Sequence, residues 1–259
     1  MHDTVHFDIP ELSSMKRYPE TLYYRGSLDL LHRPKVSIVG TRRPNPYTRA
    51  ITQELSKKLS LSGMVIVSGA AIGVDAIAHQ GAGVDNTIAV LPSGIDIRYP
   101  AVNTELIEAI ERHGLIISPF ATDFEARDWS FVVRNEIVVA LGDVLIVTEA
   151  DIGSGSMRSV EYALAMKKPI YVLPHRLRES AATRQLLSEG KAEAIDDIDI
   201  FVALISQKGR NAIEDTPFFA FCRNAPTYEE VLVKFPKDIF EAELNGIVEV
   251  RNGRVYIIE

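Results

Sequence analysis

The stretch VSIVGTRRPNPY (36–47) joins a short apolar run to a glycine, two arginines and two prolines. A continuous apolar run of this length is typical of a strand that is covered on both faces, as in a parallel sheet. Gly40 permits a tight turn directly after the run. The stretch therefore predicts a buried parallel strand that ends in a polar loop.

The same pattern recurs along most of the chain. Helical spacing separates the runs, for example at Met157, Val160 and Leu164, which steps of three and four place on one helix face. Strand and helix in alternation predict an α/β fold, a Rossmann-like, doubly wound, mostly parallel sheet. The further runs are MVIVS (64–68), TIAVL (87–91), LIIS (115–118), VLIVT (144–148) and IYVL (170–173).

The pattern fades near Ile205, and residues 206–217 are expected to form a polar linker. Beyond them we expect three short helices, one opened by a capping box of Thr227 and Glu230, and a hairpin around Asn252-Gly253. This order is typical of a winged-helix-like module. The predicted organisation is an N-terminal extension (1–33), a Rossmann-like domain (34–206), a linker (207–216) and a winged-helix-like domain (217–259).

Composition limits the classes of function. The 259 residues carry a net charge of −7 and are 46% hydrophobic, which is usual for a globular protein and argues against a broadly basic surface for duplex DNA. A local basic groove can still bind phosphates. Residues 211–259 carry nine acidic and five basic side chains, so we expect their module to contact protein. No run is long enough to span a membrane and no signal peptide is seen, so a cytoplasmic protein is expected.

Metal, cofactor and catalytic patterns are absent from the sequence. The only cysteine, Cys222, lies among phenylalanines and is expected to be a buried small hydrophobe. The six histidines show no metal-ligand spacing, and no nucleophile–base arrangement stands out. We therefore expect no metal, no cofactor and no catalysis.

In an open parallel sheet, ligands bind beyond the carboxyl ends of the strands, so the loops after the apolar runs are the candidate sites. The first loop carries Gly40, Thr41, Arg42 and Arg43, whose two guanidinium groups suit phosphate. The alternative is that both arginines lie on a solvated loop in ordinary surface ion pairs.

The second candidate loop begins SGAAIGVD (68–75). Small residues such as Ser68 and Gly69 free backbone N–H groups to bind an anion at a helix N-terminus. The alternative is that they only permit close packing of helix on sheet. Asp75 is expected to cap the helix.

The third candidate loop is Gly153, Ser154, Gly155 and Ser156, which leads into an amphipathic helix and offers amides and hydroxyls to an anion. The loop lacks the Gly-Lys-Ser/Thr ending of a Walker A motif and is not a full Gly-x-Gly-x-x-Gly fingerprint. It therefore does not predict ATP or NAD chemistry.

The fourth candidate segment combines Trp129 and Phe131 with Arg134 and Asn135. Aromatic rings beside basic side chains hold unpaired bases, at about 1–3 kcal/mol per stacked base. The alternative is that both rings pack in the core, as most aromatic side chains do.

In this order, the segments resemble the DprA/Smf family. The resemblance covers about residues 18–200 and implies a Rossmann-like core that binds single-stranded DNA, forms homodimers and loads the RecA recombinase in natural transformation. It places the DNA at Arg42, Arg43, Phe131, Arg134 and Asn135, beside the 153–156 loop. The blocks that carry it are GTRRPNPY (40–47), SGAAIGVDAIAH (68–79), TIAVLPSGIDIRYPAVN (87–103), FVVRNEIVVAL (131–141), EADIGSGSMRSVEYAL (149–164) and LLSEGKAEAI (186–195).

Departures from the family pattern leave alternatives open. This chain has Ile72, Val133 and Glu136 where members usually carry basic residues, which implies a less basic pocket. One alternative is a Rossmann-like nucleotide phosphoribohydrolase, an N-glycosidase, in which Glu161 follows the glycine-rich loop, although the Pro-Gly-Gly-x-Gly-Thr run of that class is missing. The other is a duplex-binding winged-helix regulator, which the acidic C-terminal module disfavours.

Overall fold

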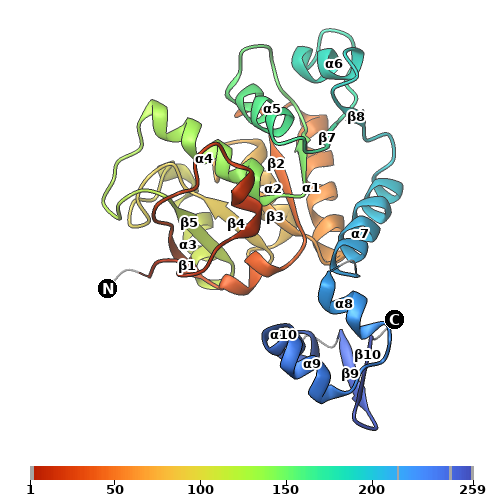
Figure 1. Cartoon of the computed structure of the whole chain (residues 1–259). Helices are drawn as coiled ribbons and strands as arrows, with labels where there is room; N and C mark the ends of the chain where they lie inside the picture. Colours follow the sequence, from red (N-terminus) through yellow and green to blue (C-terminus); the bar gives the residue numbers. More distant parts are fainter. Residues whose placement is uncertain (1–2, 215, 245–246, 258–259) are drawn as a thin grey trace. The chain divides into compact units, whose positions relative to one another are not determined.

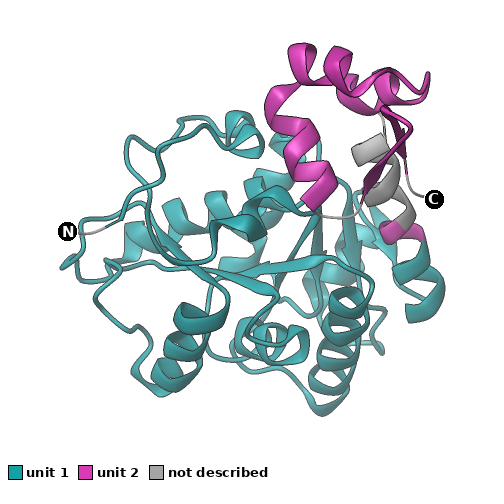
Figure 2. Cartoon of the chain, turned by 90° about the horizontal axis from the view of Figure 1, so that it is seen from below, with its two compact units in different colours: residues 1–203 teal, residues 204–259 magenta. Residues whose placement is uncertain are grey.

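The computed structural model describes residues 3–214, 216–244 and 247–257 (Figure 1). The chain divides into two compact units, Met1–Ala203 and Leu204–Glu259 (Figure 2). Among the described helices, none has the length and apolar character needed to cross a lipid bilayer.

The first unit is built around a sheet of eight strands in the order β1-β5-β4-β3-β2-β6-β7-β8 (Figure 1). All neighbouring strands run parallel except β1, which pairs antiparallel with β5. The predicted Rossmann-like α/β fold is confirmed, and β2 to β7 coincide with the six apolar runs. The strands are β1 (Tyr23–Gly26), β2 (Lys35–Val39), β3 (Val65–Ser68), β4 (Thr87–Val90), β5 (Leu115–Ser118), β6 (Val144–Val147), β7 (Ile170–Val172) and β8 (Glu193–Ala194).

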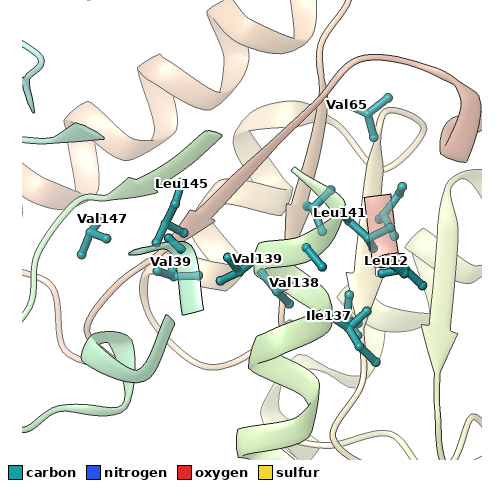
Figure 3. Close-up of a cluster of buried hydrophobic side chains, with 14 of the residues drawn as sticks. Leu12, Val39, Val65, Ile137, Val138, Val139, Leu141, Leu145 and Val147 are labelled. Atoms are coloured by element: carbon teal, nitrogen blue, oxygen red, sulfur yellow. The ribbon is translucent and has the colours of Figure 1, made fainter. Parts of the chain in front are cut away.

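Helices cover both faces of the sheet. Alternate strand residues such as Val65 and Val67 join one apolar cluster with the helix α4 (Asp128–Leu141), which Figure 3 shows in close-up. Residues of the opposite parity, such as Ala89, pack with the helix α3 (Thr104–His113). Because successive side chains of a strand point to opposite faces, an unbroken apolar run supplies both cores.

Each of the other helices α1 (Pro46–Leu61), α2 (Val74–Ala82), α5 (Gly155–Ala165) and α6 (Ala181–Ser188) of the first unit comes directly after a strand of the large sheet along the chain. The helices α1 and α2 pack against each other, and α5 packs against α4. Asn45 begins α1, since its side-chain oxygen accepts the backbone N–H of Thr48 at 2.8 Å. The helix α6 leads to the last strand. Short 3-10 helices occupy Pro10–Ser14, Leu28–His32 and Ala101–Asn103.

Two features of the first unit differ from the sequence-based expectation. The strand β1 and the buried residues Leu12, Leu30 and Leu31 lie inside the predicted N-terminal extension, so this segment contributes both a strand and core. The predicted polar linker is helical as far as Glu214, because α7 runs from Ile198 to Glu214. The segment is rich in helix-forming residues, and a single interior glycine costs only about 1 kcal/mol.

The second unit contains the helices α8 (Pro217–Cys222), α9 (Tyr228–Lys234) and α10 (Pro236–Leu244) and a two-stranded sheet. The strands β9 (Val248–Arg251) and β10 (Arg254–Ile257) flank Asn252 and Gly253, both with positive φ, so the predicted hairpin is confirmed. The predicted capping box of Thr227 and Glu230 is also present. Cys222 lies in the apolar cluster of this unit, where burial raises its thiol pKa.

Candidate nucleic-acid interface

A cavity of about 430 Å³ opens beyond the carboxyl ends of β2, β3 and β6. The loops after these strands meet there with the first turns of α4 and α5. We call it the Arg42 pocket. It brings together nine of the predicted site residues: Gly40, Thr41, Arg42, Phe131, Arg134, Asn135, Ser154, Gly155 and Ser156.

A cation and an aromatic ring lie together in the Arg42 pocket. The guanidinium carbon of Arg42 lies 5.6 Å from the centroid of the Phe131 ring, within cation–π range. Tyr99 meets the same ring edge-on, with the two ring centroids 5.6 Å apart. Gly73 has φ +89°, and a Cβ on it would lie 2.5 Å from the carbonyl oxygen of Thr41. Only glycine therefore lets the Arg42 loop approach α2 so closely.

A buried ion pair forms one wall of the Arg42 pocket. Arg134 Nη1 lies 3.4 Å from Asp75 Oδ2, and both side chains are buried. Burial raises the pKa of Asp75, while the nearby Arg134 cation opposes that rise. The buried Arg134 Nε has no hydrogen-bond partner among the described residues. The expectation that Asp75 caps its helix is wrong, because Gly73 is the N-cap and the carboxylate is engaged with Arg134.

Gly69 makes room for this guanidinium. A Cβ at position 69 would lie 1.0 Å from Arg134 Nη1, which is an impossible contact. Glycine at position 69 therefore allows the Arg134 side chain to lie directly against the backbone. Gly69 also lines a small hollow of about 40 Å³, whose lining shares Arg42, Phe131 and Arg134 with the main cavity. Exposed Ile72 lines this hollow too.

The 153–156 loop supplies polar groups at a helix N-terminus. Ser154 is the N-cap of α5, and its buried hydroxyl has no hydrogen-bond partner among the described residues. The first N–H groups of any helix lack partners inside the helix, and the helix dipole favours negative charge there. A Cβ on Gly155 would meet no protein atom within 4 Å. The open space before these amides and hydroxyls fits a phosphate oxygen.

Five predicted site residues do not line the main cavity. Gly69 lines the small hollow described above, Gly153 is exposed in the loop before α5, and the other three are Ser68, Trp129 and Arg43. The fully buried Ser68 hydroxyl donates to the carbonyl oxygen of Ile38 at 2.7 Å, so it serves the sheet and cannot contact a ligand. The Trp129 ring packs edge-on against Phe120 and Phe124 at 5.5 and 5.4 Å and does not line the cavity. Arg43 is exposed on the same loop as Arg42 and does not line it either.

Sequence reasoning missed two side chains that shape the Arg42 pocket. Asp75 holds Arg134, and Tyr99 contacts Phe131. Tyr99 lies nine residues beyond the end of β4, so no local pattern connects it with the ring of α4. In the sequence, Asp75 is an acidic residue at the start of an apolar helix, and no local pattern shows that its carboxylate is buried.

The fold and this site together define a class, a Rossmann-like α/β protein with a pocket of cations, aromatic rings and helix-terminal amides at the carboxyl edge of its sheet. Residues 5–206 match the profile of the family described as DNA recombination-mediator protein A. The chain belongs to this family, the DprA/Smf family named in the sequence analysis.

Relatives and solved structures agree with the family. Protein Smf of Synechocystis sp. is 35% identical over 196 residues, which cover 72% of this chain and 49% of that protein. DNA processing protein DprA of Bacillus subtilis is 30% identical over 198 residues, 74% of this chain and 67% of that protein. The chain thus spans about half the length of the first relative and two thirds of the second.

Two solved structures share the fold closely. DNA processing protein A of Helicobacter pylori, described in its single-stranded-DNA-binding mode, has a TM-score of 0.78 and 41% identity and covers 80% of this chain and 97% of its own. DprA of Streptococcus pneumoniae has a TM-score of 0.72 and 30% identity, covering 78% of this chain and 73% of its own.

Proposed function

We propose that this chain binds single-stranded DNA in the Arg42 pocket. Arg42 and Arg134 hold phosphates, Phe131 stacks a base, and the amides and hydroxyls of residues 153–156 contact the backbone. The observation that carries the proposal is the Arg42 guanidinium beside the Phe131 ring in one cavity. An unpaired strand alternates negative phosphates with flat bases, and this arrangement offers a partner to each.

The geometry favours an unpaired strand over a duplex. Phe131 is partly buried inside a cavity, so only a base that has left its stack can reach the ring. The net charge of −7 also disfavours the wide basic surface on which duplex binding depends. A relative supports this proposal, because DNA processing protein A of Helicobacter pylori binds single-stranded DNA.

The family membership supports a wider role. We propose that the chain acts in the cytoplasm as a homodimer that protects incoming single strands during natural transformation and loads RecA onto them. We expect the acidic C-terminal module to contact protein, which is consistent with RecA as a partner. RecA-dependent strand exchange on coated DNA, with and without the chain, is the measurement for this part.

We also propose that the pocket is not catalytic. Among the described residues that line it, Asp75 is the only carboxylate, and it is paired with Arg134. Glu161, on which the N-glycosidase alternative depends, is exposed and pairs with Arg158 at 2.8 Å. Neither carboxylate is placed to activate water. Release of free base from nucleoside monophosphates by the pure protein would contradict this part.

The binding test uses fluorescence anisotropy of a labelled oligothymidine at low and moderate salt, with a duplex of equal length for comparison. We expect salt-sensitive binding to the single strand and a loss of at least about tenfold for Arg42→Glu. The matched control is Arg43→Glu, a neighbouring exposed arginine outside the cavity, which should lose less because it acts only through screened attraction. Absence of binding by the wild type at low salt, or equal binding by Arg42→Glu, would overturn the proposal.

A further inference from the structure

A second cavity, of about 510 Å³, lies where the start of α1 meets the loop after β7. We call it the Tyr47 pocket. Its lining includes Asn45, Tyr47, His175, Arg176 and Glu179. We propose that it holds a further unpaired base of the same strand, one step along from the Arg42 pocket. The inference rests on the proposed single-stranded-DNA binding and adds a subsite to it.

Backbone contacts show that the two pockets are neighbours. The N–H of Thr41, in the first pocket, donates to the carbonyl oxygen of Glu149 at 2.8 Å. The N–H of Asn45, in the second, donates to the Glu149 carboxylate at 3.0 Å. His175 Nε2 lies 2.7 Å from the carbonyl oxygen of Thr148. Both pockets therefore flank one short segment at the carboxyl end of β6, and we place the next nucleotide of the strand at Tyr47.

The Tyr47 pocket offers a ring surface for stacking. The side chain of Tyr47 is 46% exposed although it begins a well-packed helix. Its ring meets His175 edge-on, at 5.8 Å between centroids and 84° between planes, which fixes the pair without covering both faces. A fixed and half-exposed aromatic ring beside a cavity is the platform that unpaired bases use.

Hydrogen-bonding groups of the pocket suit a base. Because His175 Nε2 faces a carbonyl oxygen, it carries the proton of the neutral ring, and Nδ1 is left as an acceptor. Among the described residues, this buried Nδ1 has no hydrogen-bond partner. The carboxylate of Glu179 adds a further acceptor for a donor on the base.

The charge of the lining favours a base over a free phosphate compound. One cation, Arg176, is balanced by the Glu179 carboxylate, so a multiply charged phosphate gains little net attraction there. Arg176 is exposed at the rim, where it can meet the single negative charge of a backbone phosphate. The pocket thus matches one nucleotide within a strand.

The test compares Tyr47→Ala, Tyr47→Phe and the wild type by anisotropy with a long and a short oligothymidine. The short strand has about four nucleotides, the lower end of the site sizes of single-strand binders, and the long strand about sixteen. We expect Tyr47→Ala to bind the long strand about fivefold or more weakly and the short strand unchanged. Tyr47→Phe keeps the ring and should bind both like the wild type.

The matched control is Tyr256→Ala, a tyrosine of similar exposure on β10 in the second unit, which should change neither affinity. Far-ultraviolet circular dichroism checks that each variant is folded. If Arg42→Glu weakens binding of the long strand but Tyr47→Ala does not, the Tyr47 subsite is wrong and the proposed function stands. If Tyr47→Ala weakens both strands equally, the subsite is also overturned. If the wild type binds neither strand at low salt, the proposed function itself fails.

Discussion

Arg134 Nη1 lies 3.4 Å from Asp75 Oδ2, and the side chains are only 6% and 8% exposed. The pair joins the middle of α4 to the start of α2 across the end of the sheet. Gly69 lies against the guanidinium, and no larger residue fits there. The pair therefore holds one cation of the Arg42 pocket in place before any ligand arrives, which lowers the entropy cost of binding.

Removing the Asp75 charge should destabilise the first unit. Asp75→Asn leaves the Arg134 cation buried without a counter-charge, which costs about 3 kcal/mol or more. Urea unfolding followed by the fluorescence of Trp129, the single tryptophan, reports on this unit. The control is Glu161→Gln, which breaks the exposed pair with Arg158 and should change the free energy of unfolding by less than about 1 kcal/mol. Equal effects of the two variants would show that the buried pair is not structurally important.

Two glycine variants should separate stability from binding. Gly69→Ala displaces the Arg134 guanidinium, so we expect a loss of about 2 kcal/mol in the free energy of unfolding as well as weaker single-strand binding. Gly155→Ala meets no protein atom within 4 Å and should leave stability unchanged. Its methyl group would enter the space proposed for the DNA backbone, so its affinity for oligothymidine should fall about tenfold. Unchanged affinity of Gly155→Ala would argue against a close approach of the strand to this loop.

The two aromatic residues of α4 should have different roles. Phe131→Ala removes the proposed base platform, so binding of oligothymidine should weaken about fivefold or more, the loss of one stacked base at about 1 kcal/mol or more. Trp129→Ala instead disrupts the packing with Phe120 and Phe124, so its main effect should be a lower melting temperature by circular dichroism. If Trp129→Ala weakens binding more than Phe131→Ala does, the assignment of the two rings is wrong.

Acid should destabilise the first unit through His79. Burial lowers the pKa of this histidine to about 3, and its Nδ1 lies 2.6 Å from Thr87 Oγ1. The unfolded chain takes up a proton near pH 6.5, whereas the folded chain stays neutral at this site until about pH 3. Stability from this residue is thus complete above pH 6.5 and falls as the pH drops, by about 2 kcal/mol between pH 7 and pH 5.

The check is urea unfolding of His79→Gln at a series of pH values. The variant should be less stable at pH 7 and should lose much of the wild-type slope between pH 7 and pH 5. His113→Gln, at an exposed histidine, is the control and should keep the wild-type slope. A wild-type slope in His79→Gln would mean that other groups account for the acid sensitivity.

Much of the fold follows from local sequence. The six apolar runs became β2 to β7 because a strand buried on both faces needs apolar residues of both parities. Asn252-Gly253 became the hairpin turn because both residues tolerate positive φ. In contrast, β1 and β8 are edge strands of four and two residues, and such strands gain their structure from the neighbour they pair with.

The sequence predicted which segments form the candidate site. Which residues of each segment face the pocket depends on the geometry of the helix or strand that carries them. Phe131, Arg134 and Asn135 lie three and four positions apart on α4, so they share a face and line the pocket. Trp129 is two positions from Phe131, which turns it away towards Phe120. Ser68 is the last residue of β3, and its side chain lies on a covered face of the sheet. There its hydroxyl donates to the carbonyl oxygen of Ile38.

The sequence by itself determined the strands, the hairpin, and the glycine, arginine and serine loops at one edge of the sheet, because each depends on short-range periodicity and backbone freedom. Only the tertiary structure decided that Arg42 faces Phe131, that Asp75 holds Arg134, and that Tyr47 meets His175. These partners lie 89, 59 and 128 positions apart in the chain. Such contacts arise from how the strands are ordered and the helices packed, which no local pattern encodes.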